Sequence, residues 1–375
     1  MRHKLILIII LTLSLVGCSQ TTTPAKTSSQ FEVPQSALTI KVPTAVSNQE
    51  QLVMRRTLAN FVTTKLRGRE GFYTNYLVSD QVGELATGHE LLSESSGLYL
   101  RHLALTGSKS DYQEFYRETK QLFGQQNQFS YRVNKGKQSA VNATVDDLRI
   151  LRSLYEYQAR HHNQSYQAEI KRLIKGLKQG GVHQGQLVDY YDPQLQKRAT
   201  KGTLCYFDLK TLAQFESQTT LQQQLALVEQ GYLNHKLPFY QTRYNYQTKK
   251  YEGGQTINTT ESLLTILHLS EIGRAKTKSL DFLTSQVQQQ SLANYYRADG
   301  QVKDTNQAVA NYGLAYLIGV NSHRQDLKKA AFKVLQQQQI TTENSVLKGG
   351  YGDPKTLATY SYNNLVVLLA LDFQK

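Results

Sequence analysis

Hydrophobic residues recur at a spacing of roughly three to four positions through most of the chain after residue 48. This spacing is typical of amphipathic helices, whose buried stripe repeats about every 3.6 residues. About twelve helices are expected, at 49–67, 90–105, 110–124, 144–161, 164–178, 208–217, 219–233, 257–272, 277–290, 307–319, 323–338 and 355–372. Capping residues at several starts and glycines at several ends, such as Gly107 and Gly124, support these limits. The pattern predicts an all-α fold.

Aromatic-rich extended segments lie between some of these helices, at 129–133, 187–191, 239–251 and 293–302. They are expected to form hairpins or long loops. Short and long connections alternate, which favours six helical hairpins closed into a double ring, an (α/α)6 barrel whose even-numbered helices form the inner ring. An irregular helical bundle or a solenoid is the alternative. No Pro-rich or charged linker interrupts residues 49–375, so one domain is expected there.

The N-terminus has the pattern of an export signal. Arg2 and Lys4 precede an apolar run at 5–16, and Leu-Val-Gly-Cys at 15–18 resembles a bacterial lipoprotein box. We therefore expect residues 1–18 to be a signal peptide ending at a lipidated Cys18, which would anchor the protein at the extracellular face of the membrane. An ordinary secretory signal is the alternative. Residues 19–48, rich in Thr, Ser, Gln and Pro, are expected to form a flexible tether.

Charge and composition narrow the choice of partners. The formal net charge is +14, with the basic residues scattered rather than clustered. Nucleic acid is not expected as a partner of an exported lipoprotein, whereas an anionic cell surface or an acidic polysaccharide is. A basic surface that is merely solvated is the simpler alternative. The only cysteine besides Cys18 is Cys205, so no internal disulfide is expected and stability must come from a packed core.

Three predicted helices begin with carboxylates. Glu94 lies near the start of the second helix, Asp146 and Asp147 near the start of the fourth, and Glu261 near the start of the eighth. Acidic residues are common at helix starts because they interact favourably with the helix dipole, and Asp147 could simply belong to a capping box begun by Thr144. In the predicted barrel, however, all three positions lie at the same mouth.

The residues around these carboxylates resemble motifs of glycoside hydrolase family 8. Ser-Glu-Ser-Ser-Gly-Leu-Tyr at 93–99 is similar to its S-E-G-Q-G-Y segment, and Ala-Thr-Val-Asp-Asp-Leu-Arg-Ile at 143–150 to its A-T-D-A-D-L-D-I segment. Leu-Cys-Tyr-Phe-Asp at 204–208 resembles P-S-Y-F-x-P, and Thr-Glu-Ser at 260–262 occupies the place of Y-D-A. The resemblance extends from about residue 50 to the end and implies the branch of the family that acts on exopolysaccharide.

This resemblance implies a general acid at Glu94, a general base at Glu261 and a sugar-holding or tuning role for Asp147. The sequence departs from the family in three motifs. In the first, Ser95, Ser96 and Leu98 replace its first glycine, its glutamine and its aromatic residue. Val145 stands where the family has its first Asp, Glu261 replaces an Asp, and Leu264 replaces the Arg that follows. An inverting glycosidase needs a protonated carboxyl group and a second carboxylate about 6.5–9.5 Å away that activates water. The apolar neighbours of Glu94 are expected to raise its pKa and suit it to the acid role.

Aromatic side chains are the expected sugar contacts, since the chain has 24 Tyr and no Trp. The candidates for substrate binding are Tyr99, Tyr131, Arg132, Asp189, Tyr191, Tyr206 and Tyr360. The nine His show no HExxH motif and no Cys partner, so neither a metal nor a cofactor is expected.

The expected function is that of a monomeric, endo-acting, inverting glycoside hydrolase that cleaves β-glycosidic bonds, β-1,4-type bonds in the first instance, of a polysaccharide or exopolysaccharide. The alternative is a surface lipoprotein that binds a glycan without cutting it and assists exopolysaccharide assembly. A solute-binding lipoprotein of a transporter is disfavoured, because the alternation of strands and helices in such folds is missing.

Overall fold

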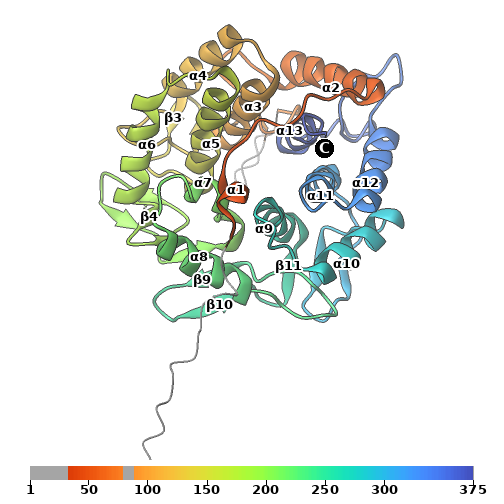
Figure 1. The fold of residues 1–375 in the computed structure, drawn as a ribbon. Coiled ribbons are helices and arrows are strands. Elements are labelled where there is room, and N and C mark those ends of the chain that lie inside the picture. The colour runs from red at the N-terminus through yellow and green to blue at the C-terminus, as the bar shows by residue number, and fades with distance from the viewer. Residues whose placement is uncertain (1–32, 79–87, 375) are drawn as a thin grey trace, which may run out of the picture. The chain divides into compact units, whose positions relative to one another are not determined.

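The computed structural model describes residues 33–78 and 88–374, which fold mostly as helices, and so confirms the all-α expectation (Figure 1). Six helices lie on the outside: α2 (Gln49–Phe61), α4 (Lys109–Phe123), α6 (Gln167–Gln179), α8 (Gln218–Gln230), α10 (Thr277–Gln288) and α12 (Gln325–Gln338). Six others lie within them: α3 (Ser93–Thr106), α5 (Thr144–His161), α7 (Leu209–Leu212), α9 (Thr259–Glu271), α11 (Val309–Asn321) and α13 (Ser361–Ala370). A five-residue π-helix, η1 (Val62–Leu66), continues α2.

The inner helices contact one another in a closed cycle. Helix α3 packs against α5, α5 against α7, α7 against α9, α9 against α11, α11 against α13, and α13 against α3. The inner helices follow one another around this cycle in chain order, and each is preceded by an outer helix that runs the chain back. All inner helix N-termini therefore lie at one end of the cycle.

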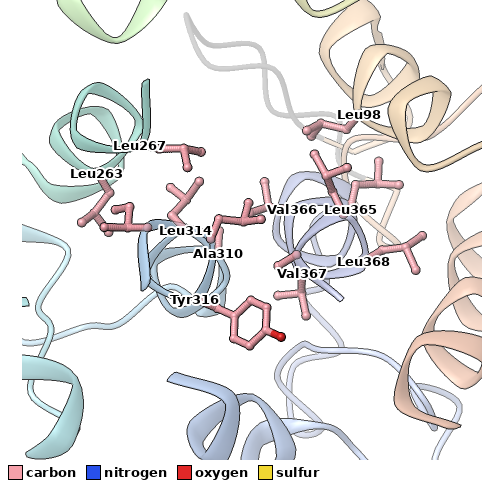
Figure 2. Packing of buried hydrophobic residues seen from close by; sticks show 14 of the residues in the cluster. Leu98, Leu263, Leu267, Ala310, Leu314, Tyr316, Leu365, Val366, Val367 and Leu368 are labelled. Carbon is pink, nitrogen blue, oxygen red and sulfur yellow. The ribbon is translucent and has the colours of Figure 1, made fainter. Parts of the chain in front are cut away.

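Burial explains why the inner and outer helices differ in sequence. Every residue of α11 from Val309 to Val320 is buried, as expected for a helix surrounded on all sides. Helix α6 on the outside buries one stripe, which includes Ile170, Leu173 and Leu177. Figure 2 shows the core between the inner helices, where aliphatic side chains from α9, α11 and α13 meet.

Short antiparallel sheets occupy most of the predicted extended segments. Three sheets have three strands: β1 (Leu91–Leu92), β2 (Arg132–Asn134) and β3 (Lys137–Gln138); β8 (Lys201–Thr203), β9 (Arg243–Asn245) and β10 (Lys250–Glu252); and β11 (Thr256–Asn258), β12 (Tyr295–Arg297) and β13 (Val302–Asp304). Two hairpins pair β4 (Val182–His183) with β5 (Gln186–Leu187), and β6 (Tyr191–Asp192) with β7 (Lys197–Arg198). Strand β1 leads directly into α3, and β11 into α9, so sheets lie at the N-terminal end of the inner helices.

The packed part of the chain begins earlier than expected. The tether was placed at 19–48, but Leu38 and Val46 are buried and a short helix, α1 (Gln35–Leu38), packs against α7. The amide of Gln214 also donates a hydrogen bond to the carbonyl of Leu38 at 2.8 Å. Leu38 and Val46 are isolated apolar residues in a polar segment and form no periodic pattern, so the sequence composition did not indicate that they are buried.

Three local expectations differ from the structure. Helix α7, expected at 208–217, is only four residues long, because Asp208 caps it and Ser217 already caps α8. Helix α13 begins at Ser361 rather than near 355, since the carboxylate and carbonyl of Asp353 hold a turn there. Thr144 does not cap α5; its amide donates to the carbonyl of Asp189 and it is the first helical residue. No helix among the described residues is long and apolar enough to cross a membrane.

Candidate active site

Glu94 lies in the first turn of α3, at the end of the ring where the sheets lie. The helix start has no side-chain cap; instead the Ser93 amide donates to the carbonyl of Tyr131 at 3.0 Å. The Glu94 side chain is half-buried, and burial raises its pKa to about 7, while Arg149 lowers the pKa and Asp146 adds to the rise. A carboxyl group with this pKa keeps a proton in a large fraction of molecules near neutral pH, as a general acid requires.

Asp146 and Arg149 form a buried ion pair beside Glu94. The Nη1 of Arg149 donates to Oδ1 of Asp146 at 2.7 Å, and the hydroxyl of Ser93 donates to Oδ2 at 2.8 Å. Burial raises the pKa of Asp146, whereas Arg149 and the Ser93 hydrogen bond lower it. Two carboxyl groups and one guanidinium thus share the space between the starts of α3 and α5, an arrangement in which one proton is readily retained.

Asp147 lies at the same helix start but faces a loop. Its Oδ1 accepts from the Phe129 amide at 2.9 Å, and its Oδ2 accepts from Nδ2 of Asn142 at 2.7 Å. The side chain is buried, and burial raises its pKa to about 7 against the effect of these hydrogen bonds. Both oxygens are thus engaged in holding the segment that positions Tyr131.

Glu261 lies in the first turn of α9, whose start is capped by the side chain of Asn258. Its half-buried side chain lines a solvent-open cavity of about 380 Å³, together with Arg243 and Tyr295. Burial raises the pKa of Glu261, while Arg243 and a hydrogen bond from Thr242 lower it. Glu261 is therefore a carboxylate with direct access to water and an adjacent cation.

The turn η2 (Leu204–Tyr206) lies near carboxyl groups from the starts of both α3 and α9. Burial and the charges of Glu261 and Asp189 raise the pKa of the Cys205 thiol well above its ordinary value, while Arg149 opposes them. Burial and the charges of Asp189, Asp146 and Glu94 likewise raise the pKa of Tyr206. Cys205 and Tyr206 thus lie within electrostatic range of carboxyl groups at the starts of both α3 and α9.

The other predicted substrate contacts divide into two groups. Asp189 belongs to the site, and its Oδ1 accepts from the Thr203 amide at 2.6 Å. Tyr131 lies beside the start of α3, and Arg132 forms an ion pair with Glu90. Tyr360 is exposed at the start of α13, at the same end of the ring.

The structure does not bring Tyr99 and Tyr191 to the site. The ring of Tyr99 is buried in the core, with its centroid 4.9 Å from those of both Phe72 and Phe115. Tyr191 is also buried, and its amide donates to Oδ1 of Asn142. Adjacent residues on a helix face different directions, so a motif match at Glu94 does not place every residue of the motif in the cleft.

Three residues of the site were missed: Arg149, Arg243 and Tyr362. Arg149 lies three positions after Asp146 on a helix, a spacing that predicts contact. Tyr362 lies in the first turn of α13, and its hydroxyl has no hydrogen-bond partner among the described residues. Burial and the nearby Glu94 charge raise the pKa of Tyr362, which also lines a small pocket together with Arg149. Arg243 lies in a strand and had no sequence signal.

A second cluster of charges lies deeper among the inner helices. One ligand atom each of Asp208, His268 and Glu271 lies within 4.8 Å of the others. Arg152 already donates to Oδ1 of Asp208 at 3.0 Å and to Oε1 of Glu271 at 2.7 Å. Because its guanidinium takes the place that a cation would occupy between the two carboxylates, this cluster is a structural ion network.

Comparison with known proteins agrees with this geometry. No protein-family model matches the chain. YdaJ of Bacillus subtilis (strain 168), a protein named as a candidate lipoprotein, is 24% identical over 381 residues, which cover 99% of this chain and 97% of YdaJ. A novel alpha-amylase from Clostridium perfringens has a similar structure, with a TM-score of 0.79 and 26% identity, covering 87% of this chain and 99% of the amylase.

Two further solved structures extend the comparison. PssZ from Listeria monocytogenes has a TM-score of 0.67 and 17% identity, covering 88% of this chain and 98% of PssZ. A cold-adapted family 8 xylanase has a TM-score of 0.60 and 11% identity, covering 87% of this chain and 90% of the xylanase. The carboxylates at the starts of α3 and α9 lie where the motifs at 93–99 and 260–262 placed them. The chain therefore has a divergent form of the fold of glycoside hydrolase family 8.

Proposed function

We propose that this protein is an endo-acting glycoside hydrolase that cleaves a polysaccharide with inversion, using Glu94 as the general acid and Glu261 as the general base. The observation that carries the proposal is the contrast between the two carboxyl groups. Burial raises the pKa of Glu94 to about 7, whereas Glu261 lines an open cavity beside the Arg243 cation. Paired carboxyl groups in such different environments are typical of acid and base assignments.

The chemistry follows from these positions. Glu94 donates its proton to the glycosidic oxygen as the bond to the anomeric carbon breaks, so the leaving group departs as an alcohol. Glu261 removes a proton from a water molecule that attacks the same carbon from the opposite face. The cavity of about 380 Å³ beside Glu261 provides room for that water and for a sugar unit. A further proton exchange with solvent returns both groups to their starting states.

Asp146 and Asp147 have separate roles in this proposal. Asp146, paired with Arg149 next to Glu94, tunes the acid. Asp147 acts indirectly: both its oxygens hold the segment from Phe129 to Asn142, which in turn supports the start of α3. Because both oxygens of each carboxylate already accept hydrogen bonds from protein groups, we propose that both residues act on the site through their neighbours.

We also propose that the architecture is the (α/α)6 double ring. Support comes from the closed cycle of inner helix contacts and from the outer helix that precedes each inner one. In this arrangement the hairpins surround a single mouth, and the charged network of Arg152 occupies the far half of the ring.

A lipid anchor at Cys18 is the proposed attachment, with residues 1–18 as the signal peptide and a monomer at the extracellular face of the membrane. Cys18 and most of the expected tether lie outside the described residues. The similarity to YdaJ along 99% of this chain supports the anchor. A Cys18→Ala variant should leave the membrane fraction for the medium or the soluble fraction, and retention in the membrane would contradict the proposal.

The test is release of new reducing ends from purified polysaccharides, with Glu94→Gln as the matched inactive variant. The amide keeps the shape of the side chain but cannot donate the proton, so the rate should fall about 10²- to 10⁴-fold while folding and glycan binding persist. Parallel assays on β-1,4-glucan, xylan and α-1,4-glucan separate the predicted β linkage from the α linkage that the C. perfringens amylase makes the second candidate. A wild-type rate in Glu94→Gln, or a first product that retains its anomeric configuration, would refute the mechanism.

A further inference from the structure

The hairpins at the N-terminal end of the inner helices expose many basic side chains. Eight exposed cations lie on their strands and turns: Lys135, Lys137, Lys197, Arg198, Lys249, Lys250, Arg297 and Lys303. We call this set the basic rim. Among the described residues none of the eight forms an ion pair with a carboxylate. Arg198 donates to the carbonyl of Gln179 and Lys303 to the hydroxyl of Thr256, so none of the eight charges is compensated by a carboxylate within the described part of the chain.

Most acidic residues of the same hairpins form hydrogen bonds or ion pairs with groups of the hairpins themselves. Asp192 is buried and accepts from the amides of Gln194 and Leu195. Glu252 is half-buried and pairs with Lys201 at 2.6 Å. Only Asp299 is an exposed acid on the hairpins that carry the rim, and its Oδ1 accepts from the Gln301 amide. The outward charge of the hairpins is thus strongly positive.

Helices α2, α4, α10 and α12 differ in this respect, because they expose both signs, with exposed acids at Glu50, Glu114, Asp281 and Asp326. Helix α6 exposes lysines such as Lys171 and no acid. The exposed charge of the hairpins, like that of α6, is therefore positive and little compensated.

The basic rim belongs to the strands that position the candidate site. Strand β1, which pairs with β2 of the Lys135 hairpin, leads into α3 and Glu94. Strand β9, which precedes Lys249, carries Arg243, and β11, which pairs with β12, leads into α9 and Glu261. Arg243 lines the cavity beside Glu261 and makes no ion pair among the described residues. The basic rim therefore lies on the sheets whose strands lead into the helices of Glu94 and Glu261.

We propose that the polysaccharide bound and cut at this site is anionic, a chain with repeated carboxylate, phosphate or sulfate groups, and that the basic rim draws it to the mouth. This inference rests on the proposed hydrolase function and adds the class of substrate. Exposed charges act over about one Debye length, roughly 8 Å at physiological salt, so rim cations on several hairpins act together on a polymer near the mouth. Such fields raise association rates by about 10- to 10³-fold.

The test removes four rim charges in the full chain, held in detergent, and compares the result with a matched control. The rim variant is Lys135→Gln/Lys137→Gln/Lys249→Gln/Lys250→Gln. The control, Lys171→Gln/Lys175→Gln/Lys329→Gln/Lys333→Gln, removes four exposed lysines from α6 and α12 and has the same net charge. Both are made in the Glu94→Gln background, so that binding is measured without turnover. The probes are carboxymethyl-cellulose, polygalacturonate and neutral hydroxyethyl-cellulose, assayed by affinity electrophoresis.

We expect the parent to bind the anionic polymers more tightly than the neutral one, with an affinity that falls as salt rises. The rim variant should bind them about tenfold more weakly and the control within about twofold of the parent. Equal weakening in both variants, equal binding of neutral and anionic polymers, or no binding of either anionic polymer would overturn the inference.

Reducing-end release by the wild-type protein on the same polymers separates the two proposals. If neutral polymers are cut as fast as anionic ones, the substrate class is wrong and the hydrolase stands. If anionic polymers bind through the rim and none is cut, hydrolase function fails and a glycan-binding protein remains.

Discussion

Among the buried ion-pairing side chains of the described residues, Arg152 is the one whose replacement we expect to lower the free energy of unfolding most. Its Nη1 donates to Asp208 at 3.0 Å, its Nη2 to Glu271 at 2.7 Å and its Nε to Glu156 at 3.2 Å. All four side chains are less than 10% exposed. Glu156 also receives Arg101, so Arg152→Met mainly strips Asp208 and Glu271 of their cation.

The magnitude follows from that burial. Removing one partner of a buried pair typically costs about 3–5 kcal/mol, because a charge is left uncompensated in the interior. A domain of this size has an unfolding entropy of about 0.7 kcal/mol per kelvin, so a loss of about 4 kcal/mol lowers Tm by about 6 °C.

The pH dependence has a definite sign. Although burial alone would raise them, Arg152 holds the pKa values of Asp208 and Glu271 below their ordinary values of 3.8 and 4.5. This stabilisation is complete above those values and is lost as pH falls through the folded-state pKa values. In Arg152→Met the two carboxyl groups are expected to take up protons at higher pH. The stability gap between the proteins should therefore be largest near pH 7 and shrink toward pH 4.

The measurement is thermal and denaturant unfolding of both proteins from pH 4 to 7, with Arg324→Met as the control. Arg324 also contacts two carboxylates, Asp281 at 2.8 Å and Asp326 at 2.7 Å, but these side chains are 52% and 43% exposed. The control should lose at most about 1 kcal/mol. Equal losses in the two variants, or a gap that does not change with pH, would refute the assignment of a structural ion network.

The remaining predictions concern the site. The pH profile of kcat/KM should be bell-shaped: activity falls as pH rises through about 7, when Glu94 loses its proton, and falls on the acid side at a pH above 4.5, when Glu261 is protonated. A basic limb beyond pH 9 would exclude Glu94 as the acid. Glu261→Gln should stop turnover while Glu261→Asp keeps measurable activity, and activity in Glu261→Gln would place the base elsewhere. Asp147→Ala should cost about 2–3 kcal/mol in urea unfolding by leaving the Phe129 amide and Asn142 unpaired, whereas unchanged stability would contradict the positioning role.

Most of the helices could be predicted from the sequence because their apolar stripes are regular. The limits of α5 agree with the pattern at 144–161, where an apolar stripe, an early carboxylate pair and a left-handed C-cap at His162 coincide. Helix α7 was overestimated because residues 213–216 have helical propensity but turn toward α8, where tertiary packing decides. The sequence did not indicate that Leu38 and Val46 are buried, because isolated apolar residues show no periodic spacing.

The site was partly predictable for a different reason. Glu94 and Glu261 occupy first turns of inner helices, and helix limits fix such positions well. The direction of a side chain within the turn is less constrained by sequence, which is why Asp147 and Asp146 have different surroundings despite being adjacent. Arg243 came from a three-residue strand more than ninety positions beyond Arg149, and the pairing of β9 with β8 places it opposite Thr203, which precedes the turn that carries Cys205.

Two of the departures from the family motifs lie at the same place in the structure. Val145, in place of the first motif Asp, and Leu264, in place of the motif Arg, both line a small pocket of about 40 Å³ between the inner helices, together with Leu98. Both side chains are half-buried there, and a charge at either position would face the cations of Arg101 and Arg149 in the same pocket. Arg149 pairs with Asp146 beside the acid. A cation and a carboxylate therefore lie beside Glu94 on residues other than the two replaced motif positions.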